Sequence, residues 1–129
     1  MRWRRGPRFG ARAPAHPPNL VREYDLVALA GAALAAVSPK FPSSNAAFWD
    51  HVNIAKELHH ISRVIVLDHR DCGAYKVAFG KDFATGHDAE TAQHKDVMLH
   101  VKAKLATTHP HLGAEFYLMA LDGKAERIV

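Results

Sequence analysis

A histidine and the only cysteine of the chain stand three residues apart, in the segment VIVLDHRDCGAYK from Val64 to Lys76. His69 and Cys72 offer an imidazole nitrogen and a thiolate, two of the ligand types that zinc prefers. Both can bind one ion only if the backbone turns sharply between them, because the two bonds are short, at about 2.0–2.1 and 2.3 Å. We therefore predict that His69 and Cys72 are ligands of a zinc ion.

The residues on either side of this pair predict the turn that the metal would need. The segment 63–67 has the length and β-branched content of a buried strand, and the segment 73–79 can form a helix after the turn. Parallel sheets bind ligands beyond the carboxyl ends of their strands, which is where His69 would lie. Cys72 would begin the helix, where the dipole and the free amides favour a thiolate. Two alternatives for Cys72 are a thiol nucleophile and a small core residue.

The rest of the chain alternates between strand-like and helix-like segments. Apolar residues at helical spacing predict a buried stripe formed by Phe48, Val52, Ala55 and Leu58. Ser44 or Asn45 is expected to cap that helix, and His109-Pro110 is expected to end the next one. The expected elements are a strand at 25–30, a helix at 46–59, the strand at 63–67, the helix at 73–79, a helix at 89–105 and a strand at 115–121 that closes into the turn Asp122-Gly123. This order predicts an α/β fold with a mainly parallel central sheet flanked by helices.

The stretch HRDCGA, residues 69–74, resembles the second zinc motif of the β-class carbonic anhydrases, a His-x-x-Cys-Gly at the end of a central strand. The segments 24–31, 48–60 and 115–122 are also similar to parts of that family, so the resemblance covers about residues 22–129. It implies a zinc cofactor and the reversible hydration of carbon dioxide to bicarbonate. It also implies a homodimer or a larger homo-oligomer.

The chain departs from the family at the other zinc motif, Cys-x-Asp-x-Arg, because it has no second cysteine. If residues 6–9 are the remnant of that motif, Arg8 takes the place of the arginine, while Arg4 and Gly6 replace the cysteine and the aspartate. We therefore expect that the first strand is lost and that the metal shell is incomplete, which would weaken zinc binding or abolish activity. A missing ligand would have to come from Asp68, Asp71, a distant histidine such as His16, or another subunit.

A non-enzymatic relative that keeps the fold for dimerisation or partner binding is the alternative to an enzyme. No catalytic residue beyond the metal ligands is predicted. Arg70 is expected to form a surface salt bridge, and Asp68 or Asp71 could also orient His69 or pair with Arg70. The remaining histidines are expected to be structural or solvated rather than ligands: His59 and His60 at a helix end, His87 and His94 with Glu90 on a solvated helix face, and His109 and His111 in a loop.

Composition separates a basic arm from one globular domain. The chain has 129 residues, 48% of them hydrophobic, and a formal charge of +4. Six arginines and no acid fall in residues 1–22, so the other 107 residues carry a formal charge of −2. We expect a disordered Pro/Arg-rich arm at 1–21 and an α/β domain at 22–129. Alternatives for the arm are organelle targeting and an electrostatic contact with nucleic acid or membrane phosphates, in which Trp3 would stack on a base.

The cysteine count and the hydropathy bear on location. A single cysteine forms no internal disulfide, which suits the reducing cytoplasm. No apolar run approaches the roughly 20 residues of a transmembrane helix. We therefore expect a cytoplasmic protein with no transmembrane segment, with an organelle as the alternative.

Overall fold

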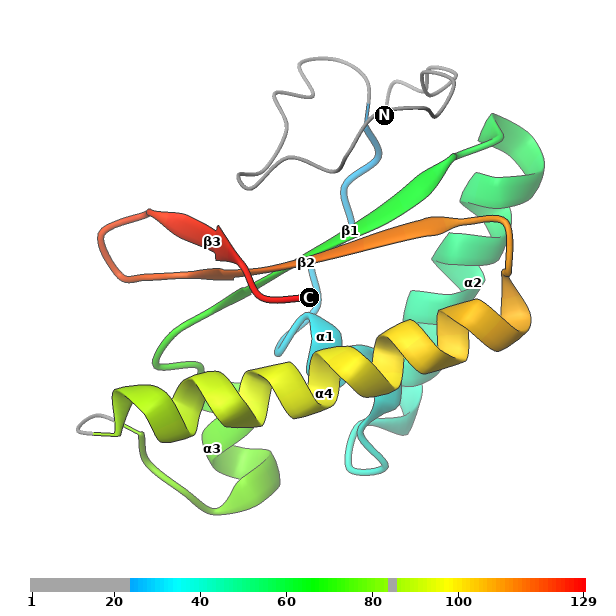
Figure 1. Cartoon of the computed structure of the whole chain (residues 1–129). Helices are drawn as coiled ribbons and strands as arrows, with labels where there is room; N and C mark the ends of the chain where they lie inside the picture. Colours follow the sequence, from blue (N-terminus) through cyan, green and yellow to red (C-terminus); the bar gives the residue numbers. More distant parts are fainter. Residues whose placement is uncertain (1–23, 84–85) are drawn as a thin grey trace.

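The computed structural model describes residues 24–83 and 86–129, which form a small α/β structure (Figure 1). The expected arm at 1–21 and the residues Arg4, Arg8 and His16 lie outside these ranges. Four helices and three strands follow one another along the described chain: α1 (Ala33–Val37), α2 (Pro42–His59), β1 (Arg63–His69), α3 (Gly73–Phe79), α4 (His87–Thr108), β2 (Gly113–Met119) and β3 (Ala125–Arg127).

The three strands form one mixed sheet in the order β1-β2-β3. β1 and β2 are parallel, in a register that pairs Arg63 with Gly113 and His69 with Met119. β3 pairs antiparallel with β2 after the turn at Asp122-Gly123. The carboxyl ends of β1 and β2 therefore lie side by side, and His69 stands at that edge of the sheet.

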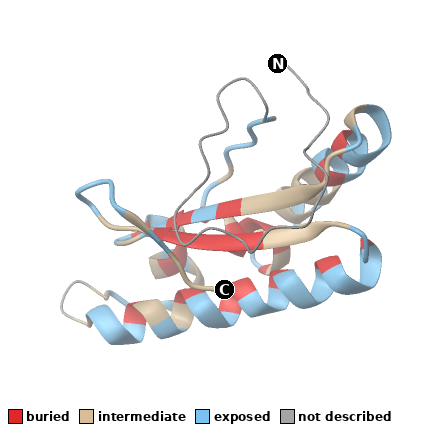
Figure 2. Cartoon of the chain, turned by 45° about the horizontal axis from the view of Figure 1, so that its top comes forward, coloured by how far each residue is buried: buried red, intermediate tan, exposed pale blue. Residues whose placement is uncertain are grey.

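The core lies between the sheet and the helices α1 and α4 (Figures 1 and 2). Side chains of β1 alternate between two faces, so Val66 and Asp68 are buried while Leu67 and His69 are exposed. Val66 belongs to a buried cluster with residues of β2 and α4, among them Phe116, Leu118, Met98, Val101 and Leu105. In the described part of the chain no helix covers the opposite face of the sheet, and Leu67 on that face is 44% exposed.

The helix expected at 46–59 begins earlier, at Pro42, whose fixed φ and missing N–H suit the first helical turn. The expected cap by Ser44 or Asn45 is wrong, because the residue before the helix is Phe41. The Asn45 amide instead donates to the backbone oxygens of Ala35, Ser38 and Phe41. Asn45 thereby ties the start of α2 to α1.

The predicted stripe on α2 is confirmed only in its centre. Val52 and Ala55 are buried, Phe48 is partly buried, and Leu58 is 68% exposed. Leu58 follows the helical spacing, but no described element packs over the last turn of α2. The prediction for Leu58 is therefore wrong.

Three further expectations about elements are corrected. The segment 25–30 is not a strand, because its backbone pairs with no strand of the described sheet. Residues 33–37, which follow the turn at Gly31, form helix α1 instead of irregular chain. β3 was not expected, and its antiparallel pairing makes the three-stranded sheet mixed, where a mainly parallel sheet was predicted.

The other predicted elements are confirmed with small changes at their ends. α3 spans the predicted residues, and β1 continues two residues past Leu67. α4 extends the predicted helix 89–105 by a few residues at each end, and His109 follows its last residue. β2 begins two residues before the first residue of the predicted strand 115–121 and ends two residues before its last residue.

No helix within the described ranges is long and apolar enough to cross a membrane.

Candidate functional site

The sharp turn that the His-x-x-Cys pair requires is present. β1 ends at His69, and α3 begins at Gly73, with Cys72 as the residue that precedes the helix. Asp71 adopts a left-handed backbone conformation, with φ +56°, and this reverses the chain between the two elements. Aspartate tolerates that conformation better than most residues do. The strand, the turn and the helix thus follow one another as the sequence predicts.

The imidazole of His69 is exposed and is oriented by its neighbour. Its Nδ1 lies 2.8 Å from the backbone oxygen of Arg70. Because a carbonyl oxygen only accepts hydrogen bonds, Nδ1 must carry the proton, and the neutral ring presents a lone pair on Nε2. A histidine whose second nitrogen donates to a carbonyl is the usual arrangement for a metal-binding imidazole. His69 therefore has the tautomer that a ligand needs.

Cys72 is a free thiol and is 6% exposed. It belongs to the hydrophobic core cluster that also contains Tyr75 and Val66. Its position before the first residue of α3 is the predicted one. His69 and Cys72 are thus three residues apart across the turn, one exposed and one buried.

Arg70 fastens the turn to α4. Its Nη1 lies 3.0 Å from Glu90 Oε1, and its Nη2 donates to Thr91 Oγ1 at 2.8 Å. The other oxygen of Glu90 accepts the backbone N–H of Asp71 at 2.8 Å. The side chains of Arg70 and Glu90 are 11% and 7% exposed, so this is a shielded ion pair and not the expected surface bridge. The pair holds the backbone of the turn against the first turns of α4.

Asp71 and Lys76 form a second ion pair, on the exposed side of the turn. Lys76 Nζ lies 2.6 Å from Asp71 Oδ1. The hydrogen bond from Lys76 and its positive charge lower the pKa of Asp71. The same bond raises the pKa of Lys76. The Asp71 carboxylate is therefore paired with the ammonium of Lys76 on α3.

Asp68 points to the opposite face of β1 from His69 and lies in the core. Its carboxylate accepts three hydrogen bonds from three different elements: the backbone N–H of Ala33 at 2.9 Å, the hydroxyl of Tyr75 at 2.7 Å and Nδ1 of His94 at 2.7 Å. The side chains of Asp68 and His94 are each 1% exposed. Asp68 thus joins the end of β1 to α1, α3 and α4.

Tyr75 and His94 complete this buried cluster. Burial raises the pKa of Tyr75 far above its ordinary value, and the Asp68 carboxylate raises it further, so the phenol remains a hydrogen-bond donor. The rings of Tyr75 and His94 have centroids 3.8 Å apart. Nε2 of His94 is buried and finds no hydrogen-bond partner among the described residues. An unsatisfied buried polar atom costs about 1–3 kcal/mol.

Gly31 forms the tight turn that brings Ala33 to this cluster. It has φ +84°, and a Cβ at this position would lie 3.0 Å from Leu34 Cβ and 3.1 Å from Ala74 Cβ. The tight turn that follows presents the N–H of Ala33 to Asp68. Gly31 thereby places the start of α1 beside the start of α3.

The described residues do not by themselves form a complete zinc site. Within residues 24–83 and 86–129, no three His, Cys, Asp or Glu side chains are close enough together to hold a metal ion. Zinc sites in proteins use at least three protein ligands. Asp68 and Asp71, two of the ligands considered above, are bonded to other groups. His69 and Cys72 therefore provide at most half of a shell.

Comparison with known proteins reveals relatives of unknown function. No family model matches the chain, and no solved structure does. An uncharacterized protein of Rickettsia bellii is 34% identical to the chain over 110 residues, which cover 85% of this chain and 67% of that protein. The chain belongs to the family of that protein. An uncharacterized protein of Rickettsia conorii is 35% identical over 110 residues, and the match covers 85% of this chain and 59% of that protein.

The family thus includes longer proteins. The chain spans between about three fifths and two thirds of the length of these two relatives. The names of both relatives give no activity, ligand or partner.

The structure corrects the expectation that Glu90 and His94 lie on a solvated face. Glu90 is 5% exposed and His94 is fully buried, whereas His87 is exposed as expected. The two residues lie on the buried side of α4, because Arg70 and Asp68 of the β1 end meet them there. His109, expected in a loop with a structural or solvated role, follows the last residue of α4 and is 6% exposed, and its ring stacks on Trp49 with centroids 6.1 Å apart.

The buried cluster of Asp68, Tyr75 and His94 was missed by sequence reasoning, although a signal for it exists. Asp68 follows Val64 and Val66 at a spacing of two, which puts a carboxylate on the buried face of the strand. His94 shares the helical face of Met98, Val101 and Leu105. A polar residue on each of two apolar faces predicts a buried polar pair.

Proposed function

We propose that this chain contributes His69 and Cys72 to a zinc centre of the β-carbonic-anhydrase type, and that the completed centre hydrates carbon dioxide reversibly to bicarbonate. One observation carries the proposal: the turn after β1 ends a parallel strand at His69 and begins a helix at Cys72, with His69 Nδ1 committed to the Arg70 oxygen. This arrangement leaves Nε2 of His69 for a metal. Zinc with an open position supplies a hydroxide nucleophile near neutral pH.

Other residues of the turn support the two ligands without binding the metal. The Arg70–Glu90 pair and the bond from Asp71 N to Glu90 hold the backbone between His69 and Cys72. Asp68, on the opposite face, holds the end of β1. These contacts keep the two ligands at one edge of the sheet before any ion is bound, which lowers the ordering cost of binding.

The remaining ligands must come from residues outside the described ranges or from another subunit. Asp68 accepts three hydrogen bonds in the core, and Asp71 is paired with Lys76, so neither is available as an oxygen ligand. His16 and a group from another subunit remain from the candidates named above. The proposal therefore requires that the zinc shell be completed by such a group.

Zinc content is the decisive test. The full chain, purified without a histidine tag and without added metal, is expected to hold about one zinc per chain by elemental analysis. Cys72→Ser and His69→Gln should each lose most of the metal, because each removes one ligand. His87→Gln is the matched control, since His87 is an exposed histidine away from the turn. Zinc that is absent from the wild type, or equal in all four proteins, would refute the metal centre.

Activity is tested separately, by stopped-flow measurement of carbon dioxide hydration with zinc supplied. The wild type should accelerate hydration, and Cys72→Ser should reduce the rate to that of buffer with free zinc. Equal rates for the two proteins would exclude the hydratase even if zinc is bound. The chain would then be a zinc protein of another kind.

The second candidate is a non-enzymatic partner-binding or self-associating protein. It is favoured by the edge of β1 that pairs with no other strand of the described residues, and by the exposed Leu67 on the sheet face that no described helix covers. An unpaired strand edge offers backbone groups to another chain. Light scattering should then show a dimer or a larger oligomer, and a monodisperse monomer would count against this candidate.

A further inference from the structure

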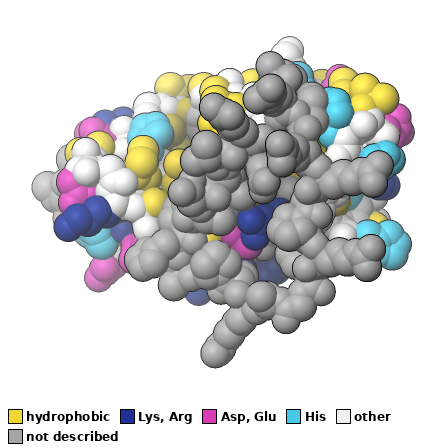
Figure 3. Space-filling view, turned by 90° about the horizontal axis from the view of Figure 1, so that it is seen from above, with side chains coloured by type: hydrophobic (Ala, Val, Ile, Leu, Met, Phe, Trp, Pro, Cys, Tyr) yellow, Lys and Arg dark blue, Asp and Glu magenta, His cyan; other side chains and the backbone are white. Residues whose placement is uncertain are grey.

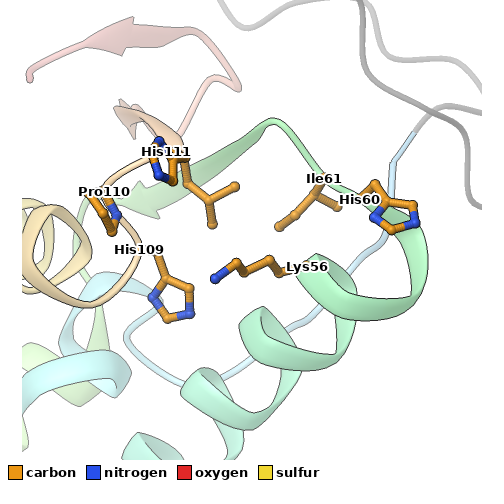
Figure 4. Close-up of a pocket in the computed structure, with 7 residues that line it drawn as sticks. Lys56, His60, Ile61, His109, Pro110 and His111 are labelled. Carbon is orange, nitrogen blue, oxygen red and sulfur yellow. The ribbon is translucent and has the colours of Figure 1, made fainter.

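A small cavity lies at the edge of the sheet opposite the His69 turn. It has a volume of about 250 Å³ and lies where α2 runs into β1 and α4 runs into β2 (Figure 4). Its walls are formed by two segments that immediately precede the strands, together with one residue of α2: Lys56, His60, Ile61, His109, Pro110, His111 and Leu112. Histidine side chains are also visible at this end of the molecule from above (Figure 3, right).

The walls of the cavity are held in place by backbone contacts. Gly113 N donates to Ser62 O at 3.0 Å, which joins the two segments at the amino ends of β1 and β2. Leu112 N donates to His109 O at 3.0 Å and closes the loop around Pro110. His60 has a left-handed backbone, φ +51°, which turns the chain out of α2. The cavity is therefore formed before any ligand enters.

His109 is a fixed wall of the cavity. Its Nε2 lies 2.7 Å from Asn53 Oδ1 and its Nδ1 lies 2.7 Å from Thr108 Oγ1. Its ring also stacks on Trp49. Because both nitrogens are occupied, His109 shapes the cavity and leaves binding to its neighbours.

Among the described residues, the side chains that line the cavity carry only positive charge. Lys56 extends from α2 toward His109, and no described residue that lines the cavity is acidic (Figure 4). Lys56 forms no ion pair within the described part of the chain. Burial lowers the pKa of His109, and the positive charge of Lys56 lowers it further. A cation without a partner in a concave site attracts anions.

We infer that this cavity binds a small phosphate-type oxyanion, with Lys56 as the charged contact and His111 as a hydrogen-bonding side chain at the rim. A lysine ammonium is a common phosphate partner. The volume suits a ligand of a few heavy atoms, and the apolar walls of Ile61, Pro110 and Leu112 leave room for a short carbon chain on the phosphate. The ligand is therefore free phosphate or a small phosphate ester.

The test uses the full chain and NMR of the histidine rings, with inorganic phosphate and propyl phosphate as probes and sodium chloride at matched ionic strength as the reference. The ring signals of His111 should shift and saturate, while those of the exposed His100 should not. Lys56→Gln should weaken binding about ten- to hundredfold, because it removes a charge-assisted hydrogen bond. Lys102→Gln, which replaces an exposed lysine of α4, should change the affinity for phosphate less than about twofold.

The two probes separate the two sources of phosphate. Tighter binding of propyl phosphate identifies an ester as the ligand, and equal binding identifies free phosphate. Shifts that do not saturate, that affect all histidines alike, or that persist unchanged in Lys56→Gln would overturn the inference. His111→Gln, in an exposed loop position, provides a second variant if Lys56→Gln alters the fold. None of these measurements depends on zinc, because the His69 turn lies at the other edge of the sheet.

Discussion

Asp68 Oδ2 lies 2.7 Å from His94 Nδ1, and both side chains are 1% exposed. This contact joins the end of β1 to the middle of α4, and Tyr75 and Ala33 N bond to the same carboxylate. Asp68 adjoins His69 in the sequence, so the core contact and the exposed histidine share one strand end. The contact therefore determines where the His-x-x-Cys turn begins.

Replacing Asp68 should destabilise the protein strongly. Asp68→Ala leaves Ala33 N, the Tyr75 hydroxyl and His94 Nδ1 without an acceptor in the core. Each buried donor left without an acceptor costs about 1–3 kcal/mol. Urea unfolding should show that loss, while Asp96→Ala, which removes a 65% exposed aspartate of α4, should stay within about 0.5 kcal/mol of the wild type. Equal midpoints for the two variants would contradict the role of Asp68.

Replacing Gly31 by alanine should also destabilise the fold. The left-handed backbone costs a non-glycine residue about 1–3 kcal/mol, and the new Cβ would also crowd Leu34 and Ala74. Gly123→Ala is the matched control, because Gly123 has φ +88° and nothing within 4 Å of its added Cβ. Urea unfolding should show a larger loss for Gly31→Ala. Equal losses would mean that crowding at Gly31 is relieved without cost.

The Asp71–Lys76 pair should make stability depend on acid pH. Pairing with Lys76 lowers the pKa of Asp71 in the folded protein. The contribution of the pair to the free energy of unfolding is therefore fully present above the unfolded pKa, about 3.9, and is lost as the pH falls through the folded pKa. Asp71→Asn keeps a residue that tolerates the left-handed turn. Its melting temperature should lie below that of the wild type at pH 7, and the two should converge in acid. A difference that stays constant from neutral to acid pH would exclude this pair as its source.

Arg70→Lys should weaken the attachment of the turn to α4. A lysine cannot contact Glu90 and Thr91 together as the guanidinium does, so the shielded Glu90 carboxylate loses part of its partner. We expect a loss of about 1–3 kcal/mol in urea unfolding. Glu126→Gln removes the 66% exposed second carboxylate, 3.7 Å from Arg70, and should have little effect. An Arg70→Lys variant with the same free energy of unfolding as the wild type would show that the turn is held without this pair.

Short-range patterns in the sequence determined the elements around the turn. The β-branched run before His69 predicts β1, and the residues after Cys72 predict α3, whose observed bounds are the predicted ones. Neighbouring residues along the chain decide these features, through strand preference and through the geometry of the turn. For the same reason the position of Cys72 before α3 could be predicted.

The tertiary structure decided what depends on partners distant in the sequence. The segment 25–30 has strand-like residues, but a strand exists only beside another, and none of the described strands pairs with it. Glu90 and His94 are buried because Arg70 and Asp68 reach them from another element. Sequence alone places Asp68 beside His69 on alternate faces of a strand, while the packing of α1, α3 and α4 decides which face is the core, so that Asp68 is buried and His69 is exposed.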